Sequence, residues 1–185
     1  MFLAGIESRA NTVSARLPDK SSMVIVASGH GVRASIEQDG AAAPRPGRAV
    51  GVDRRITAAM RQATQIIAVA GRGFSQDGRD FVVLGVAIPS VAKQGSSYCG
   101  AGSEDYVLLI EWHPRSRTLK LRDRLRVQSC LQSMELQSDQ GSDLRVVLRG
   151  VADPARVDLT WLQHPRYGPA TKTLTIGAGK FILSP

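Results

Sequence analysis

Six basic side chains fall within twelve consecutive residues, with Asp123 as the only acidic residue among them: Arg115, Arg117, Lys120, Arg122, Arg124 and Arg126. Side chains two positions apart on one face of a β-strand lie about 7 Å from each other. Such a row of cations suits a polyanion or the acidic face of a protein. The alternative is a solvated sheet surface whose arginines pair across strands with residues such as Glu111 and Glu135.

Two adjacent carboxylates, Glu104 and Asp105, follow a Gly- and Ser-rich segment. Carboxyl groups can serve as general acid and general base, so an alternative function is a small hydrolase that uses them beside the loop at 95–103. Adjacent carboxylates before a strand are also typical of a solvated turn. The Ser90–Lys93 spacing matches a Ser-x-x-Lys pattern without its companion elements. We therefore assign no catalytic residue and lean away from an enzyme.

The chain has two cysteines, Cys99 and Cys130. A disulfide between them would add about 3–4 kcal/mol of stability by restricting the unfolded chain. Two unlinked thiols in a reducing compartment fit the same count. We expect the disulfide, and with it a periplasmic or secreted protein, although no clear signal peptide is present.

The remaining chemistry is sparse, and the charge is the main indication of a partner. His30, His113 and His164 are far apart and lack metal-ligand spacing, so we expect neither a metal site nor a cofactor. Against 16 Asp and Glu stand 24 Lys and Arg, a formal net charge of +8 spread along the chain. This balance favours an acidic partner, either a protein or, less favoured, a nucleic acid. Nucleic-acid-binding proteins often stack bases on aromatic side chains, and the basic row contains no aromatic residue. No apolar run approaches the ~18 residues of a membrane span.

Strands are the elements that must position these residues. Residues 81–88 form a continuous apolar run that ends at Pro89, which indicates a central strand covered on both faces. Residues 106–112 predict a second strand, and strict alternation over 119–127 predicts a third with its four cations on one face. Asp123 breaks that alternation, so either a bulge lies there or an inward carboxylate is paired. Further strands are expected at 130–136, 144–149, 156–162 and 173–183. The prediction is a mainly β chain, a single antiparallel β-sandwich or small barrel with one short N-terminal helix.

The N-terminal part is harder to interpret. Apolar residues over 52–70 recur at intervals of three, four and seven positions, which favours a short helix. The alternative is that the β-branched residues Ile66, Ile67 and Val69 begin a strand. Residues 40–47 have a linker-like Gly, Ala and Pro composition. We expect a weakly ordered extension at 1–50 and an antiparallel β domain at 51–185.

These features predict a non-enzymatic binding protein. The composition, rich in Ala, Gly and Arg, suggests a bacterial gene. The expected role is an exported recognition or inhibitor module of the immunity type, which binds an acidic protein through the Arg-rich strand face. The hydrolase and a nucleic-acid-binding β domain are the alternatives, and the sequence leaves the oligomeric state open.

Overall fold

The computed structural model describes residues 11–38, 47–90, 102–137, 143–148 and 150–185. The chain is mainly β, which confirms the fold class expected from the sequence. Its strands are β1 (Asn11–Arg16), β2 (Ser22–Ser28), β3 (Gly31–Glu37), β4 (Arg48–Val52), β5 (Gln65–Ala68), β6 (Phe74–Gln76), β7 (Arg79–Pro89), β8 (Ser103–His113), β9 (Thr118–Ser129), β10 (Glu135–Leu136), β11 (Arg156–Gln163), β12 (Ala170–Gly177) and β13 (Lys180–Ser184). The helical elements are α1 (Arg54–Met60), the 3₁₀ turn η1 (Val69–Gly71) and α2 (Leu144–Leu148).

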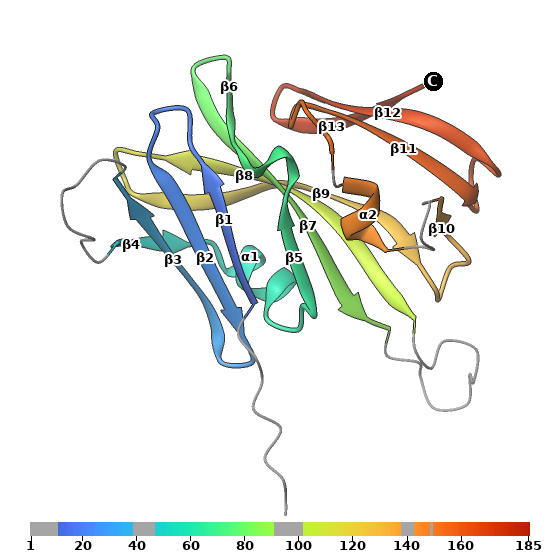
Figure 1. Cartoon of the computed structure of the whole chain (residues 1–185), viewed down its shortest axis with the longest axis horizontal. Helices are drawn as coiled ribbons and strands as arrows, with labels where there is room; N and C mark the ends of the chain where they lie inside the picture. The colour runs from blue at the N-terminus through green and yellow to red at the C-terminus, as the bar shows by residue number, and fades with distance from the viewer. Residues whose placement is uncertain (1–10, 39–46, 91–101, 138–142, 149) are drawn as a thin grey trace, which may run out of the picture.

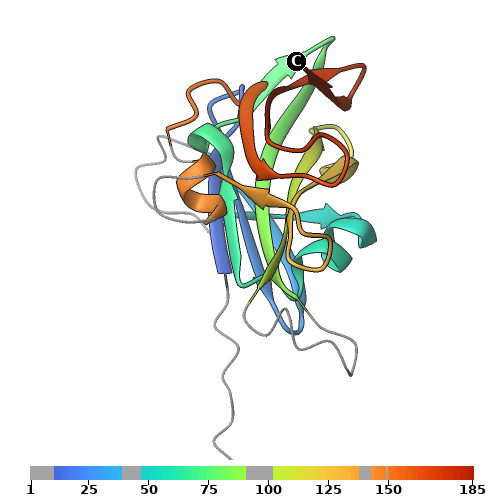
Figure 2. The ribbon, with the colours of Figure 1, turned by 90° about the vertical axis from the view of Figure 1, so that its right-hand side faces the viewer.

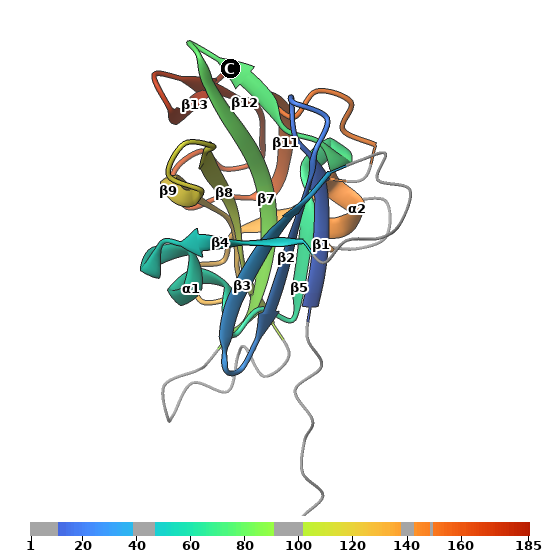
Figure 3. The same ribbon diagram turned by 90° about the vertical axis from the view of Figure 1, so that its left-hand side faces the viewer.

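A curved sheet nearly closes on itself as a barrel, in the order β1-β2-β3-β4-β9-β8-β7-β5, with β6 paired to β7. Neighbouring strands in it are antiparallel, except that β4 runs parallel to β9. The barrel closes between the two ends of this order, β1 and β5. Two hydrogen bonds of 2.6 Å cross this gap, from the Asn11 side-chain amide to the Ala63 carbonyl and from the Gly73 N–H to the Arg16 carbonyl. In Figure 3 the blue strands β1–β3 form the near wall, and β4 leads into α1.

The strands β7 and β8 lie at the centre of the molecule and are buried on both faces (Figure 1). Their even-numbered side chains, such as Leu84 and Leu108, fill the barrel together with α1. Their odd-numbered side chains, such as Val83 and Leu109, pack against the C-terminal sheet. A strand with two covered faces needs apolar residues on both, which explains the continuous apolar run at 81–88. The predicted central strand is confirmed.

The C-terminal sheet, in the order β10-β11-β12-β13, covers the outer face of β7–β9 (Figures 1 and 2). Its anchor is Trp161, which is 1% exposed and donates its indole N–H to the Val127 carbonyl at 2.7 Å. The helix α2 lies on β7 at Gly85, where an added Cβ would overlap Leu148. A side chain at this position would force its neighbours to shift, because the helix packs closely on the backbone of the strand.

Two β-bulges interrupt β9 where it pairs with β8. At the first, Asp123 lies opposite Leu109 while Leu121 lies opposite Ile110, so one extra residue is inserted into β9. The sequence left open a bulge or a paired inward carboxylate at Asp123, and the structure has both. Asp123 Oδ2 accepts the N–H of Phe181 in β13 at 2.8 Å, which ties the C-terminal sheet to the barrel. The second bulge lies opposite the step from Asp105 to Tyr106.

The expectation of weak order at 1–50 is wrong for residues 11–37, which form β1–β3 and supply one wall of the barrel. Residues 40–46 of the linker-like segment lie outside the described residues. The helix expected at 52–70 ends at Met60, and the strand alternative is correct for Gln65–Ala68. The β-branched pair Ile66 and Ile67 belongs to this strand.

Three of the four later strand predictions need correction. Residues 144–148 form the helix α2, in which Leu144 and Leu148, four positions apart, are the buried pair. Only Glu135–Leu136 is strand within 130–136. Residues 173–183 make a hairpin of β12 and β13, while β11 agrees with its prediction. No helix in the described part of the chain is long and apolar enough to span a bilayer.

Candidate functional site

The first bulge divides the four cations of β9 between two faces of the sheet. Leu121, before the bulge, belongs to the barrel core, whereas Leu125, after it, packs against the C-terminal core. The cations change faces in the same way, so the C-terminal-sheet side holds Lys120 and Arg122, and the barrel side holds Arg124 and Arg126. The expectation that all four share one face is wrong, because an inserted residue reverses the orientation of the residues that follow it, here up to the second bulge.

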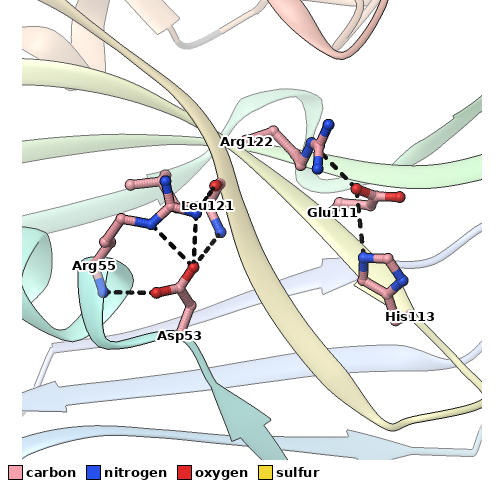
Figure 4. Close-up of polar contacts among 6 residues, drawn as sticks. All are labelled: Asp53, Arg55, Glu111, His113, Leu121 and Arg122. Atoms are coloured by element: carbon pink, nitrogen blue, oxygen red, sulfur yellow. Dashed lines mark hydrogen bonds and ion pairs between the residues drawn. The ribbon is translucent and has the colours of Figure 1, made fainter.

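On the C-terminal-sheet side, Arg122 is paired with a buried carboxylate (Figure 4). Arg122 Nε lies 3.3 Å from Glu111 Oε2, and His113 Nε2 lies 3.4 Å from the same oxygen. Glu111 is 3% exposed, so the ion pair is shielded from solvent on its acidic side. The cross-strand pairing with Glu111, expected as the alternative to a binding face, is present for Arg122.

A second carboxylate in Figure 4 fixes the edge of β9 beside α1. Asp53 caps α1 by accepting the Arg55 N–H at 2.9 Å, and its other oxygen accepts the Leu121 N–H at 3.4 Å. Arg55 Nη2 donates to the Leu121 carbonyl at 2.7 Å. Although burial raises the pKa of Asp53, the hydrogen bonds from Arg55 and Leu121 and the Arg55 charge lower it below its ordinary value. These groups are thus engaged in holding the strand.

On the barrel side, Arg124 and Arg126 converge on one aromatic ring. The guanidinium carbon of Arg124 lies 3.4 Å from the centroid of the Tyr106 ring, and that of Arg126 lies 5.4 Å from it. Arg126 Nε also donates to the Tyr106 hydroxyl at 3.2 Å. Together with Gln132, these residues line an open hollow of about 410 Å³. Within the described residues, the Arg124 guanidinium has no hydrogen-bond acceptor and no ion-pair partner, so its N–H groups are available to a ligand.

The carboxylate of Glu104 lies beside one member of this arginine pair, Arg126. Its oxygens accept the Ser129 hydroxyl at 2.7 Å, the Ser90 hydroxyl at 3.1 Å and the Leu131 N–H at 3.2 Å. Glu104 Oε2 lies 3.6 Å from Arg126 Nε. Glu104 is 8% exposed, and its hydrogen bonds satisfy the requirement that a buried charge be paired. Its role in the fold is to hold Arg126 and the turn after β9.

Asp105 points away from Glu104, because consecutive side chains on a strand lie on opposite faces. It is 1% exposed, and burial raises its pKa to about 6, helped by the charges of Asp143 and Glu104 and opposed by a hydrogen bond from Ser103. The structure therefore does not bring the two carboxylates of the hydrolase alternative together. Residues 95–101 of the loop proposed beside them lie outside the described residues.

Arg115 and Arg117 lie in the turn between β8 and β9, far from the hollow along the strand. Arg117 has a left-handed backbone (φ 52°), and its carbonyl accepts the Gly51 N–H at 2.9 Å. The hairpin predicted for this segment is confirmed by the antiparallel pairing of His113 with Thr118. The six basic residues of the sequence prediction thus form three groups at different places, and the group made by Arg124 and Arg126 lines the hollow.

Cys99 lies outside the described residues, so its bridge to Cys130 stays a prediction. Cys130 follows β9 directly, and its N–H donates to the Ser103 carbonyl at 3.2 Å. An added Cβ at Gly102 would lie 2.6 Å from Cys130 Sγ, so the start of β8 passes tightly against the sulfur.

Tyr106 and Gln132 are the site residues that sequence reasoning missed. Tyr106 belongs to the apolar even-numbered series of β8, where an aromatic residue is typical of core. Tyr106 is far from the arginines in sequence, and the antiparallel pairing of β8 with β9 places it opposite Arg126. The sequence offers one indication of this role. Tyr106 lies near one end of a row of buried apolar residues, and the hydroxyl of a buried tyrosine needs a polar partner.

His113 and His164 lie at strand ends, and His30 lies in the turn between β2 and β3. His113 is the last residue of β8, and His164 follows β11, where its ring stacks on Tyr167 and its Nδ1 accepts the Arg166 N–H at 3.0 Å. Burial lowers the pKa of His164, and the Arg166 charge adds to this effect. Among the described residues, no three His, Cys, Asp or Glu side chains are grouped as a metal site.

Comparison of the chain with protein-family models, curated proteins and solved structures finds no match to any of them. The function must therefore be inferred from the chemistry of the hollow.

Proposed function

We propose that this protein is a non-enzymatic binding module that recognises acidic groups on a protein partner through the hollow formed by Tyr106, Arg124, Arg126 and Gln132. The observation that carries the proposal is the pair of guanidinium groups gathered on one aromatic ring at an open surface. The setting we propose is an exported bacterial recognition or inhibitor module. Compared with the whole basic row expected from the sequence, this is a smaller and more specific surface.

The stacked arrangement supports binding because it orders the arginines in advance. A cation over an aromatic face is stabilised by about 0.5–2 kcal/mol, and a side chain already held in place loses less entropy when a ligand arrives. Arg126 is restrained by the Tyr106 hydroxyl and by Glu104, and Arg124 by the Tyr106 ring. Arginine prefers oxyanions such as carboxylates, which its planar N–H groups contact in pairs.

The test is the binding of an acetylated, amidated hexaglutamate peptide, followed by calorimetry at low salt. The double variant R124E/R126E should weaken binding roughly 100-fold or more, because each charge-assisted hydrogen bond contributes about 1.5–3 kcal/mol. The matched control R115E/R117E has the same change in net charge and lies in the distant turn. It should reduce binding only a few-fold, through long-range attraction that salt screens.

An equal loss in both double variants would show that net charge alone attracts the peptide, and the hollow would be rejected as the site. The nucleic-acid alternative is tested with a duplex DNA probe. Affinity that falls with salt at a slope near −0.9 per phosphate contacted, and that exceeds the affinity for the peptide, would replace the proposal with that alternative.

A further inference from the structure

The charges around the hollow leave it net positive. Its described lining holds two cations, Arg124 and Arg126, and two uncharged residues, Tyr106 and Gln132. Glu104 lies outside that lining and contributes one negative charge, 3.6 Å from Arg126 Nε. Two positive charges and one negative charge leave a balance of about +1. A site of positive potential attracts a dianion more strongly than a monoanion, because the attraction grows with the charge of the ligand.

We infer that the ligand of the hollow is a phosphate monoester on a side chain of the partner protein, such as a phosphoserine. This inference rests on the proposed function and names its ligand class. A phosphoserine carries a charge of about −1.5 to −2 at pH 7, whereas an aspartate or glutamate side chain carries a single charge. Each phosphodiester of a nucleic acid also carries a single charge. The positive balance of the hollow therefore favours the monoester over both.

The hydrogen-bond donors of the hollow exceed the needs of one carboxylate. Those of the Arg124 guanidinium are unused within the described residues. Arg126 uses its Nε for the Tyr106 hydroxyl and Glu104, which leaves the N–H groups of its terminal nitrogens. The Tyr106 hydroxyl accepts that bond, so its own hydrogen can be donated. A carboxylate has two acceptor oxygens and a phosphate monoester has three, so the phosphate uses more of these donors.

The two guanidinium groups are placed to serve one ligand together. Their carbons lie 3.4 Å and 5.4 Å from the centroid of the same Tyr106 ring. Glu104 lies on the Nε side of Arg126, so a ligand on the terminal nitrogens is nearer to the guanidinium groups than to that carboxylate. Clusters of arginine are a recurring means of recognising phosphorylated side chains, because the planar guanidinium matches the spacing of phosphate oxygens.

The open shape of the hollow suits a phosphate that is presented by a larger molecule. Sites for free small molecules enclose most of the surface of the ligand, whereas this hollow is open and has four lining residues in the described part of the chain. Proteins that bind single-stranded nucleic acid stack bases on aromatic faces, and Arg124 covers a face of the Tyr106 ring. Both features favour a phosphorylated protein segment as the occupant.

The experiment compares acetylated, amidated peptides that differ only at the central residue, which is phosphoserine, glutamate or serine. At pH 7.5 the protein should bind the phosphoserine peptide about tenfold more tightly than the glutamate peptide, as expected for an extra negative charge beside a positive site. The serine peptide should not bind measurably. At pH 5.5 the phosphoserine is mostly a monoanion, and its preference over glutamate should fall to within about threefold. The ratio of the two affinities cancels protein titrations that affect both peptides alike.

The variant R124Q removes the guanidinium group that has no polar partner in the described residues. It should weaken binding of the phosphoserine peptide about tenfold or more, because charge-assisted hydrogen bonds are lost. Its preference for phosphoserine over glutamate should fall to within about threefold. The control R115Q loses the same charge in the exposed turn between β8 and β9, and it should change either affinity by less than about threefold.

The outcomes separate this inference from the proposed function. If the glutamate peptide binds at least as tightly as the phosphoserine peptide at pH 7.5, and R124E/R126E abolishes binding of both, the phosphate ligand is refuted while the binding function stands. A preference for phosphoserine that is unchanged at pH 5.5 would also refute recognition of a dianion. Inorganic phosphate that competes as strongly as the phosphoserine peptide would assign the hollow to a free phosphate compound and overturn the protein-borne ligand. If no peptide binds, the proposed function fails, and this inference fails with it.

Discussion

The substitution Asp105→Asn tests the most unusual ionisable group described in the fold. Asp105 is 1% exposed, and one of its carboxyl oxygens, Oδ1, has no hydrogen-bond partner among the described residues. Burial, together with the charges of Asp143 and Glu104, raises its pKa from 3.8 to about 6. Because the folded state holds this proton more tightly than the unfolded state, the contribution of Asp105 to stability is greatest below pH 4. It is lost progressively as the pH rises to about 6.

The size of the effect follows from the two pKa values. Each tenfold difference in proton affinity corresponds to about 1.4 kcal/mol, so the difference between 3.8 and about 6 corresponds to about 3 kcal/mol. Asparagine cannot ionise and has nearly the same size. Asp105→Asn should therefore be more stable than the unaltered protein at pH 8, by up to about 3 kcal/mol, and close to it at pH 4.

The assay is urea unfolding of both proteins at five pH values between 4 and 8, with the difference in unfolding free energy as the readout. Taking the difference cancels the titration of the other groups. Asp77→Asn, in the exposed turn between β6 and β7, is the control for loss of one negative charge. A difference that stays flat from pH 4 to pH 8, or a variant less stable than the unaltered protein at pH 8, would refute the reasoning.

Three further substitutions test how the layers are joined. Gly85→Ala should lower the free energy of unfolding by about 1–3 kcal/mol in urea, since the added methyl group overlaps α2, and an unchanged midpoint would contradict that packing. Trp161→Phe should cost about 1–3 kcal/mol, because the buried Val127 carbonyl loses its donor, and a loss of a few tenths would show that the bond is dispensable. Asp123→Ala should cost about 1 kcal/mol and speed hydrogen exchange of the Phe181 amide, whereas unchanged protection of that amide would show that β13 does not depend on Asp123.

The central strands are the part of the fold that the sequence predicts best. A continuous apolar run such as 81–88 predicts a strand that is covered on both faces, and β7 is such a strand. The N-terminal strands carry weaker signals. In β2 the buried residues Met23, Ile25 and Ala27 alternate with half-buried Val24 and Val26, so the two faces differ little in hydrophobicity. Tertiary packing decides such segments, and local composition does not.

The candidate site shows why strict alternation is an incomplete guide. In the sequence, apolar and basic residues alternate from Leu119 to Val127 with Asp123 at one of the apolar positions. In the structure this alternation does not correspond to two constant faces, because the bulge before Asp123 reverses the faces of the strand. The sequence marks this position as irregular but does not say which residues lie beyond the reversal on which side. That information comes from the register with β8, which also brings Tyr106 to Arg126. The arginines of the site were predicted, and their grouping was not.

The double burial of β7 and β8 limits how the molecule can be dissected. A truncated chain without residues 150–185 would leave Val83, Val107 and Leu109 without the C-terminal sheet that covers them on the outer face of the barrel. Such a surface favours self-association of the fragment. The barrel is therefore no independent module to which a C-terminal layer was appended, and the two layers should gain or lose their structure in a single cooperative event.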